Sequence, residues 1–200
     1  MMKSLLASFF AGTFAVSAST TVINTFPDWD NNVTLYWFKV AQSFLAPADN
    51  TLSSWEFALA TNGGQNSVLF QIVPWNPNSG PSGAALFSRE VPWPTPGGHV
   101  LVSNINLTLQ PGARYAAVID LEGYEGSSVH YQQNQNSYDQ GRASWFNSGT
   151  WDYLTSTYNT SFRAEFSAVP EPEGFKILFA ALLVLAAAPR TFSGSCERPR

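Results

Sequence analysis

The sequence is poor in cysteine, in histidine and in charge. Cys196 is the only thiol among the 200 residues, so no disulfide can form within the chain. His99 and His130 are the only histidines and lie far apart, and with no second thiol a zinc site is not expected. Any folded domain must therefore be stabilised by an ordinary hydrophobic core.

Charge is scarce and mostly negative. Charged residues make up 12% of the chain, and residues 19–168 contain five Lys or Arg against eleven Asp or Glu, which leaves a net charge of −6. Domains that bind nucleic acid carry clustered Lys and Arg. We therefore expect no nucleic-acid partner.

Long apolar helical patterns are missing from the middle of the chain, but one lies near its start. Lys3 precedes an apolar run over residues 5–16, and Ser17 and Ala18 are small residues suited to cleavage. This is the layout of a secretory signal peptide. We predict a signal helix over residues 1–18, cleavage after Ala18 and export of the rest. The alternative, a buried N-terminal helix, would normally carry a polar face, which this run lacks.

Residues 19–168 have the length of one domain and contain all seven tryptophans. Short aromatic and β-branched runs alternate there with Gly, Pro and Asn turns, which is typical of an all-β domain. We expect strands over residues 21–26, 33–44, 52–60, 68–75, 85–91, 100–109, 114–121, 129–132, 143–146 and 161–168.

Within several of these runs, apolar and polar residues alternate. The apolar sets are Trp55, Phe57 and Leu59; Val68, Phe70 and Ile72; and Phe162, Ala164 and Phe166. Alternation of apolar and polar residues with a period of two gives each strand one buried and one solvent-exposed face, which predicts antiparallel sheets packed face to face. In the first run this places Ser54, Glu56 and Ala58 on the outer face. The predicted fold is an all-β antiparallel sandwich of the jelly-roll type, with a tight turn over residues 109–114.

The C-terminal segment, residues 169–200, has three parts in a fixed order. Pro170, Glu171 and Pro172 lie in a short motif over residues 169–172, and an apolar helical run follows over residues 175–188. A basic end over residues 190–200 contains Arg190, Arg198 and Arg200. The apolar run has fourteen residues, fewer than the roughly 20 that a bilayer crossing needs, so a permanent anchor is not expected.

This order resembles the PEP-CTERM sorting signal of Gram-negative bacteria. The resemblance implies that Pro170, Glu171 and Pro172 are recognised by exosortase, a membrane protease, and that the basic residues form a stop on the cytoplasmic side. It also implies transient insertion in the inner membrane, then delivery to the cell surface or release. Segments 41–52, 81–86 and 109–115 are similar to β-rich domains that accompany such tails. The alternative is that residues 175–188 form a helix of the domain itself.

Aromatic residues in polar or proline-rich connections are the best binding candidates in the exported part. Trp75 and Trp93 lie in Val-Pro-Trp segments, and Tyr124, Tyr138 and Trp151 lie in or beside a stretch rich in Gln, Asn and Ser. Such rings stack on sugars while neighbouring amides and carboxylates bond the hydroxyl groups. The competing interpretation is that these aromatics close the open ends of the sandwich core.

Catalytic residues are harder to find. Asp120, Glu122 and Glu125 cluster at a predicted strand end, where a glycosidase would need two carboxyl groups roughly 5–10 Å apart. An acidic surface turn gives the same pattern. His99 and His130 have no motif that links them to a nucleophile, so we expect structural roles for both.

A weak calcium candidate lies near the N-terminus of the domain. Asp28, Asp30 and Asn32 alternate in a loop-like stretch and could supply oxygen ligands, although an Asx-rich turn gives the same spacing. Apart from this structural calcium, no cofactor is expected.

The sequence leads to three hypotheses about function. The first is an exported, non-enzymatic surface or extracellular-matrix protein that, as the resemblance implies, is associated with exopolysaccharide or biofilm. The second is a carbohydrate-binding module that uses exposed Trp and Tyr. The third is a secreted glycan-active enzyme, which requires paired carboxylates in a cleft.

Overall fold

The computed structural model describes residues 19–29, 32–34, 39–61, 67–92, 98–121, 130–135, 138–147, 149–153 and 158–168. The chain divides into two units, Met1–Val169 and Pro170–Arg200, and all described residues belong to the first. The predicted signal helix over 1–18, the sorting motif, the hydrophobic helix and the basic end lie outside the described residues. Where the structure describes the chain, no helix is long and apolar enough to span a bilayer.

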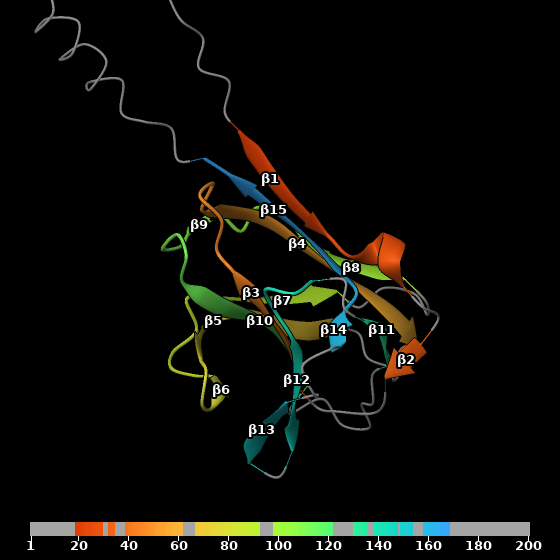
Figure 1. Ribbon diagram of the computed structural model, residues 1–200. Coiled ribbons are helices and arrows are strands. Elements are labelled where there is room, and N and C mark those ends of the chain that lie inside the picture. The colour runs from red at the N-terminus through yellow and green to blue at the C-terminus, as the bar shows by residue number, and fades with distance from the viewer. Residues whose placement is uncertain are drawn as a thin grey trace, which may run out of the picture. The chain divides into compact units, whose positions relative to one another are not determined.

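The described residues form two antiparallel sheets and one short 3-10 helix, η1 (Phe26–Asp28) (Figure 1). The first sheet has eight strands, with a main path β1-β15-β4-β11-β14. Strands β8 and β9 pair with β4, and β2 pairs with β11. These strands are β1 (Thr20–Asn24), β2 (Asn32–Thr34), β4 (Thr51–Thr61), β8 (His99–Val102), β9 (Leu107–Thr108), β11 (His130–Gln135), β14 (Tyr158–Thr160) and β15 (Phe162–Ser167).

The second sheet has seven strands in the order β13-β12-β3-β10-β5-β6, and β7 also pairs with β5. Its strands are β3 (Lys39–Leu45), β5 (Ser67–Asn76), β6 (Gly80–Pro81), β7 (Phe87–Pro92), β10 (Arg114–Asp120), β12 (Ala143–Asn147) and β13 (Thr150–Tyr153). Successive strands often alternate between the sheets. For example, β3 and β5 belong to the second sheet, whereas β4 belongs to the first.

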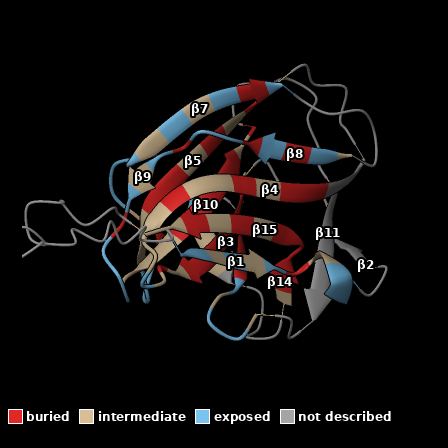
Figure 2. Ribbon diagram, turned by 90° about the horizontal axis from the view of Figure 1, so that it is seen from above, coloured by how far each residue is buried: buried red, intermediate tan, exposed pale blue. Residues whose placement is uncertain are grey.

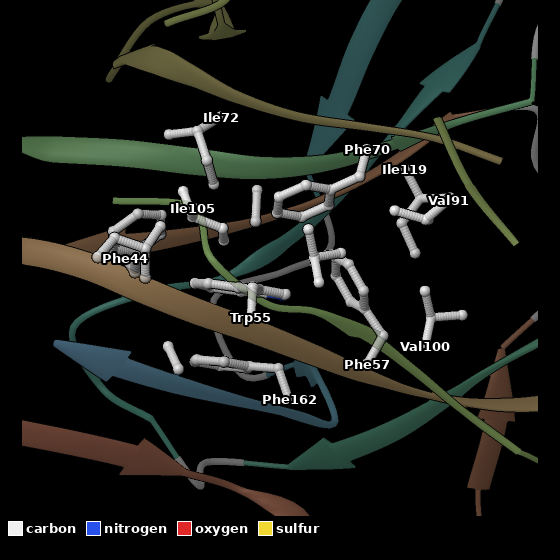
Figure 3. Packing of buried hydrophobic residues seen from close by; sticks show 14 of the residues in the cluster. Phe44, Trp55, Phe57, Phe70, Ile72, Val91, Val100, Ile105, Ile119 and Phe162 are labelled. Carbon is white, nitrogen blue, oxygen red and sulfur yellow. The ribbon is translucent and has the colours of Figure 1, made fainter. Parts of the chain in front are cut away.

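The two sheets pack face to face around an aromatic core (Figure 3). Phe44 of the second sheet lies 5.0 Å, centroid to centroid, from Trp55 of the first, and Phe57 lies 5.7 Å from Phe70. Trp55 stacks in parallel on Phe162 at 4.7 Å, as Figure 3 also shows. The predicted β-sandwich is therefore confirmed.

The alternating pattern predicted the buried face correctly. Val68, Phe70 and Ile72 are fully buried, and so are the apolar residues of β15. Figure 2 shows buried residues concentrated on β4, β5, β10 and β15, whereas β7 and β8 carry exposed segments. One detail differs: Ala58, predicted on the outer face of β4, is buried, and its N–H donates to the carbonyl oxygen of Ser161.

Two of the predicted strands are wrong in extent. Residues 33–44 were expected to form one strand, but β2 and β3 belong to different sheets. Residues 100–109 instead form two short strands, β8 and β9. Between them Asn104 and Asn106 have φ values of 54° and 52°, a left-handed conformation that interrupts an extended chain. The short strands β6, β13 and β14 were not predicted.

The turn over residues 109–114 is confirmed. It joins β9 to β10, and the N–H of Ala113 donates to the carbonyl oxygen of Gln110 at 3.1 Å. Pro111 and Gly112 are its central residues, and Gly112 has a φ of 73°. This is the geometry of a type II turn, which favours proline and then glycine at these two positions.

A buried glutamine links the two sheets. The side chain of Gln42 on β3 is fully buried, and its Nε2 donates to Oδ1 of Asn159 and to the carbonyl oxygen of Ser43, both at 2.9 Å. Its Oε1 accepts from the backbone N–H of Thr160 at 2.8 Å and from the Thr160 hydroxyl at 3.1 Å. All polar groups of this amide that face the interior are therefore satisfied.

The first described residues are held by a carboxylate. The hydroxyls of Ser19 and Thr21 donate to Oδ1 and Oδ2 of Asp49, at 2.6 Å and 2.8 Å. These bonds, first that of Ser19 and then that of Thr21, hold the pKa of Asp49 below 3.8, its ordinary value.

Asp49→Asn is expected to destabilise the domain at neutral pH and to have little effect in acid. Because folding lowers the pKa of Asp49, its contribution is fully present above the unfolded-state pKa and is lost as pH falls through the folded-state pKa, below 3.8. Urea unfolding of wild type and variant at neutral pH and below pH 3.8 checks this. In a Ser19→Ala/Thr21→Val background the substitution should have little effect at either pH. A stability difference that does not change with pH would contradict the assignment.

Candidate functional site

The outer face of the second sheet carries a buried apolar cluster, which is unusual for a sheet face that does not contact the other sheet. Ala41, Val73, Ala116 and Val118 form a second hydrophobic cluster there, separate from the main core. They alternate with core residues along β3, β5 and β10, so these strands are buried on both sides. Trp75 and Trp151 pack against this cluster and partly cover it.

The two ends of the second sheet approach each other over this face. Strand β13 and strand β6 occupy opposite ends of the strand order, yet residues of the two strands lie close together. Figure 1 shows both at the same end of the molecule. The second sheet therefore curves over its outer face, and its two ends border a hollow of about 190 Å³ that is open to solvent. We call this hollow the trough; Val73 and Val118 form its floor.

One wall of the trough is aromatic. Phe146 on β12 and Trp151 on β13 are direct partners in the hairpin, with ring centroids 5.4 Å apart at 65°. Both rings are half-buried. Gly149, at the turn of this hairpin, has a φ of 89°, a conformation that residues with a Cβ rarely adopt.

The opposite wall is a short backbone segment. Pro81, Ser82 and Gly83 line the trough where the chain leaves β6. Its position is fixed by the N–H of Ser82, which donates to the carbonyl oxygen of Pro74 at 2.9 Å. This wall therefore offers a small hydroxyl and backbone groups opposite two aromatic rings.

The lining of the trough also carries both signs of charge. Lys39 and Asp120 are paired across β3 and β10, and Lys39 Nζ lies 3.0 Å from Asp120 Oδ2. Only 19% and 13% of these side chains are exposed. Lys39 Nζ also lies 5.3 Å from the centroid of the Phe146 ring, within cation–π range. Gln71 on β5 adds an amide to the same lining.

The predicted glycan contacts divide into three groups. Trp151 lines the trough, and Trp75 packs against the cluster beneath it. Trp93 and Tyr124 lie outside the described residues. Tyr138 is directed into the domain: its ring packs edge-on against Phe162 at 5.6 Å, and its hydroxyl accepts a hydrogen bond from the N–H of Leu45 at 3.0 Å.

The environment of Tyr138 indicates a structural role. Burial raises the pKa of its phenol above 10.0, so the hydroxyl stays neutral at ordinary pH. Gly141 lies directly against it, since a Cβ placed there would meet Tyr138 Cε1 at 2.6 Å and the carbonyl oxygen of Ser43 at 2.0 Å. Of the two interpretations of this tyrosine, closure of the core is the one that its contacts favour.

Tyr138→Phe is expected to lower the free energy of unfolding by about 1–3 kcal/mol, because the part-buried N–H of Leu45 loses its acceptor. Tyr115→Phe is a matched control, since the Tyr115 hydroxyl accepts from Gln110 N–H at an exposed position where water can replace it. Urea unfolding compares the two variants. If both variants lose the same free energy of unfolding, the hydrogen bond from Leu45 N–H to Tyr138 does not stabilise the domain more than an exposed one.

The other predicted site residues are less informative. Asp120 lies in the trough, whereas Glu122 and Glu125 lie outside the described residues, so the predicted carboxylate pair stays a prediction. His99 Nδ1 is 2.7 Å from Glu56 Oε1, and the His99 ring packs at 4.6 Å from Phe26, which fits a structural role.

The predicted calcium ligands are only partly described. Asp28 ends η1 and is exposed, Asp30 lies outside the described residues, and of Asn32 only the backbone is described. Among the described side chains, no three His, Cys, Asp or Glu residues come together as metal ligands. The calcium site therefore remains a sequence-based prediction.

The trough combines apolar, aromatic and polar side chains, so it offers both ring faces and hydrogen-bonding groups. Lys39, Gln71, Phe146 and residues 81–83 were not predicted as site residues. No short motif marks them, because they converge only through strand pairing.

Comparisons with known proteins identify the fold and no family. No protein-family model matches the sequence, and no curated protein matches it. Among solved structures, the chain is similar to the clostridial cysteine protease Cwp84 after propeptide cleavage, with 11% identity and a TM-score of 0.52 over 75% of this chain and 40% of that one. A structure of the cysteine protease and lectin-like domains of Cwp84, a surface layer associated protein of Clostridium difficile, matches with 13% identity and a TM-score of 0.44 over 70% and 37%. The chain thus spans less than half of these structures, and the likeness shows an all-β fold and no activity.

Proposed function

We propose that the chain is an exported, non-enzymatic protein of the cell surface or extracellular matrix, and that its β-sandwich binds glycan in the trough. The observation that carries this proposal is the aromatic wall of Phe146 and Trp151 over an apolar floor, next to the Lys39–Asp120 pair. Sugar rings have apolar C–H faces that pack on aromatic rings and hydroxyl groups that need donors and acceptors. The trough supplies both.

The trough favours binding over hydrolysis. A glycosidase of the usual kind needs two carboxyl groups that flank the scissile bond. Among the described residues that line the trough, Asp120 is the only carboxylate, and it is paired with Lys39. A secreted glycan-active enzyme is the alternative, and it would need a second carboxylate beside Asp120.

The strand order supports a fold of the jelly-roll type, which is our proposal for this sandwich. Its eight principal strands pair as β1-β15-β4-β8 in one sheet and β3-β10-β5-β7 in the other. Two Greek keys wound in this way make a jelly roll, an architecture used by many lectin domains. This analogy agrees with glycan binding, but a shared architecture does not by itself establish a shared function.

Export and sorting complete the proposal. The first and last strands are neighbours: Thr20 pairs with Ser167, and the N–H of Ala168 donates to the carbonyl oxygen of Ser19 at 3.2 Å. Cleavage after Ala18 and again near residues 169–172 would therefore remove no described strand of the sandwich. This agrees with a domain that is released from both ends by processing, through a signal peptidase and an exosortase.

The sorting step is tested by intact mass and cell fractionation of the protein in its native host. A variant with Pro170, Glu171 and Pro172 replaced by Ala is compared with the wild type. The wild type should lose both ends and leave the inner membrane, while the variant should keep its tail there. If both forms keep the tail and fractionate alike, the sorting proposal is wrong.

Glycan binding is tested by affinity electrophoresis of the full-length protein in native gels that contain dissolved polysaccharide. Neutral probes are dextran, hydroxyethylcellulose, mannan and galactan; acidic probes are alginate and polygalacturonate. Retardation by at least one polysaccharide, lost on substitution of Trp151, supports the proposal. The same mobility in every gel as in a polymer-free gel would overturn it.

A further inference from the structure

We propose that the trough selects neutral sugars over acidic ones, and that the Lys39–Asp120 pair determines this selection. The inference rests on the proposed glycan binding and names the chemical class of the ligand. It starts from the position of the pair, in the lining of the trough and beside the Phe146 ring. A ligand that packs on the aromatic wall would therefore reach both charged groups.

The opposite charges of Lys39 and Asp120 cancel, so the pair gives the trough no net positive charge that would attract an acidic sugar. A uronate or sulfate group binds best to a cation that is not already neutralised. Here the ammonium of Lys39 lies 3.0 Å from Asp120 Oδ2, and the two side chains are only 19% and 13% exposed. A second carboxylate brought to Lys39 would lie next to that of Asp120, and like charges at such distances repel strongly when solvent is scarce.

The charge of the rest of the domain acts in the same direction. Residues 19–168 carry a net charge of −6, so the domain as a whole repels polyanions. Neutral polysaccharides are not repelled in this way. The long-range field and the local pair therefore both disfavour acidic ligands.

The same pair suits the hydroxyl groups of a neutral sugar. An ammonium group has three N–H donors, and a carboxylate has several acceptor positions, so each group can bond more than one partner. A hydroxyl both donates and accepts. Two adjacent hydroxyls on one ring can therefore accept from Lys39 and donate to Asp120, while the Gln71 amide offers a further donor and acceptor.

Asp120→Asn tests this selection. The change keeps the shape of the side chain but removes the negative charge opposite Lys39. We expect about tenfold weaker binding of the neutral polysaccharide that retards the wild type, because a hydrogen bond to a charged acceptor is stronger than one to a neutral amide. We also expect new retardation by alginate, a polymer of uronates. Lys39→Met should weaken neutral binding without any gain on alginate.

Glu56→Gln is the control, because it removes the same charge from the other sheet, where Glu56 contacts His99. It should leave both affinities unchanged, and thermal unfolding should show that all variants are folded. If Asp120→Asn behaves like Glu56→Gln, or if the wild type prefers alginate, the selection is wrong although glycan binding in the trough stands. If the wild type is retarded by no polysaccharide, the proposed function fails and this inference fails with it.

Discussion

Trp151→Ala is expected to weaken glycan binding at least tenfold, the largest functional effect among single substitutions. Trp151 forms the aromatic wall with Phe146, and large half-buried aromatics that contact a ligand commonly contribute about 2 kcal/mol or more. Affinity electrophoresis against the best neutral polysaccharide measures the change. Trp151→Phe keeps a ring in the wall and should lose less.

The matched control is Trp29→Ala. Trp29 is 37% exposed, directly follows η1 and does not line the trough. Its loss should not change the affinity. If Trp29→Ala and Trp151→Ala weaken binding equally, or if neither does, the trough is not the glycan site.

Gln42→Leu is expected to lower the free energy of unfolding by about 3 kcal/mol or more. Leucine has a similar size but leaves Thr160 N–H, Asn159 Oδ1 and the Ser43 carbonyl without the amide that satisfies them. Each buried polar group that loses its partner costs about 1–3 kcal/mol, although the terms are not additive within one network. Urea unfolding should show a lower midpoint with an unchanged slope.

Gln110→Leu provides the comparison for this variant. Gln110 is exposed in the turn that joins β9 to β10, and only its backbone takes part in the turn. Its substitution should change stability by less than about 0.5 kcal/mol. Similar midpoints for the two variants would mean that the Gln42 amide does not join the sheets as the geometry indicates.

The inner face of the sandwich was predictable because burial repeats with the period of the strand. Phe70 and Phe162 lie in runs where every second residue is apolar, and both are fully buried. The same rule could not reveal Gln42, a polar residue on the inner face. Its partner Asn159 is 117 positions away, and nothing near Gln42 in the sequence indicates it.

The trough was only partly predictable, for a related reason. Trp151 and Asp120 were both noticed in the sequence, the first as an aromatic in a polar stretch and the second as part of an acidic cluster. Their association with Lys39 and Phe146 depends on the register of β10 with β3 and of β12 with β13. Curling of the second sheet, which brings β6 near β13, has no local sequence signal.

Strand boundaries failed where the chain changes sheet. The run over residues 33–44 is uniformly rich in β-forming residues, so composition indicated one strand, yet β2 and β3 belong to different sheets. Asn104 and Asn106 could have indicated the break between β8 and β9, because asparagine adopts positive φ more readily than most residues.

The most direct test of the central claim is an NMR titration of the full-length protein with ¹⁵N-labelled tryptophan. The seven indole N–H signals, assigned with single Trp→Phe variants, are followed as the neutral polysaccharide that retards the protein is added. We predict that the signals of Trp151 and Trp75 shift with added glycan while that of the fully buried Trp55 stays in place. A titration that shifts the Trp29 signal and leaves Trp151 unmoved would contradict the account.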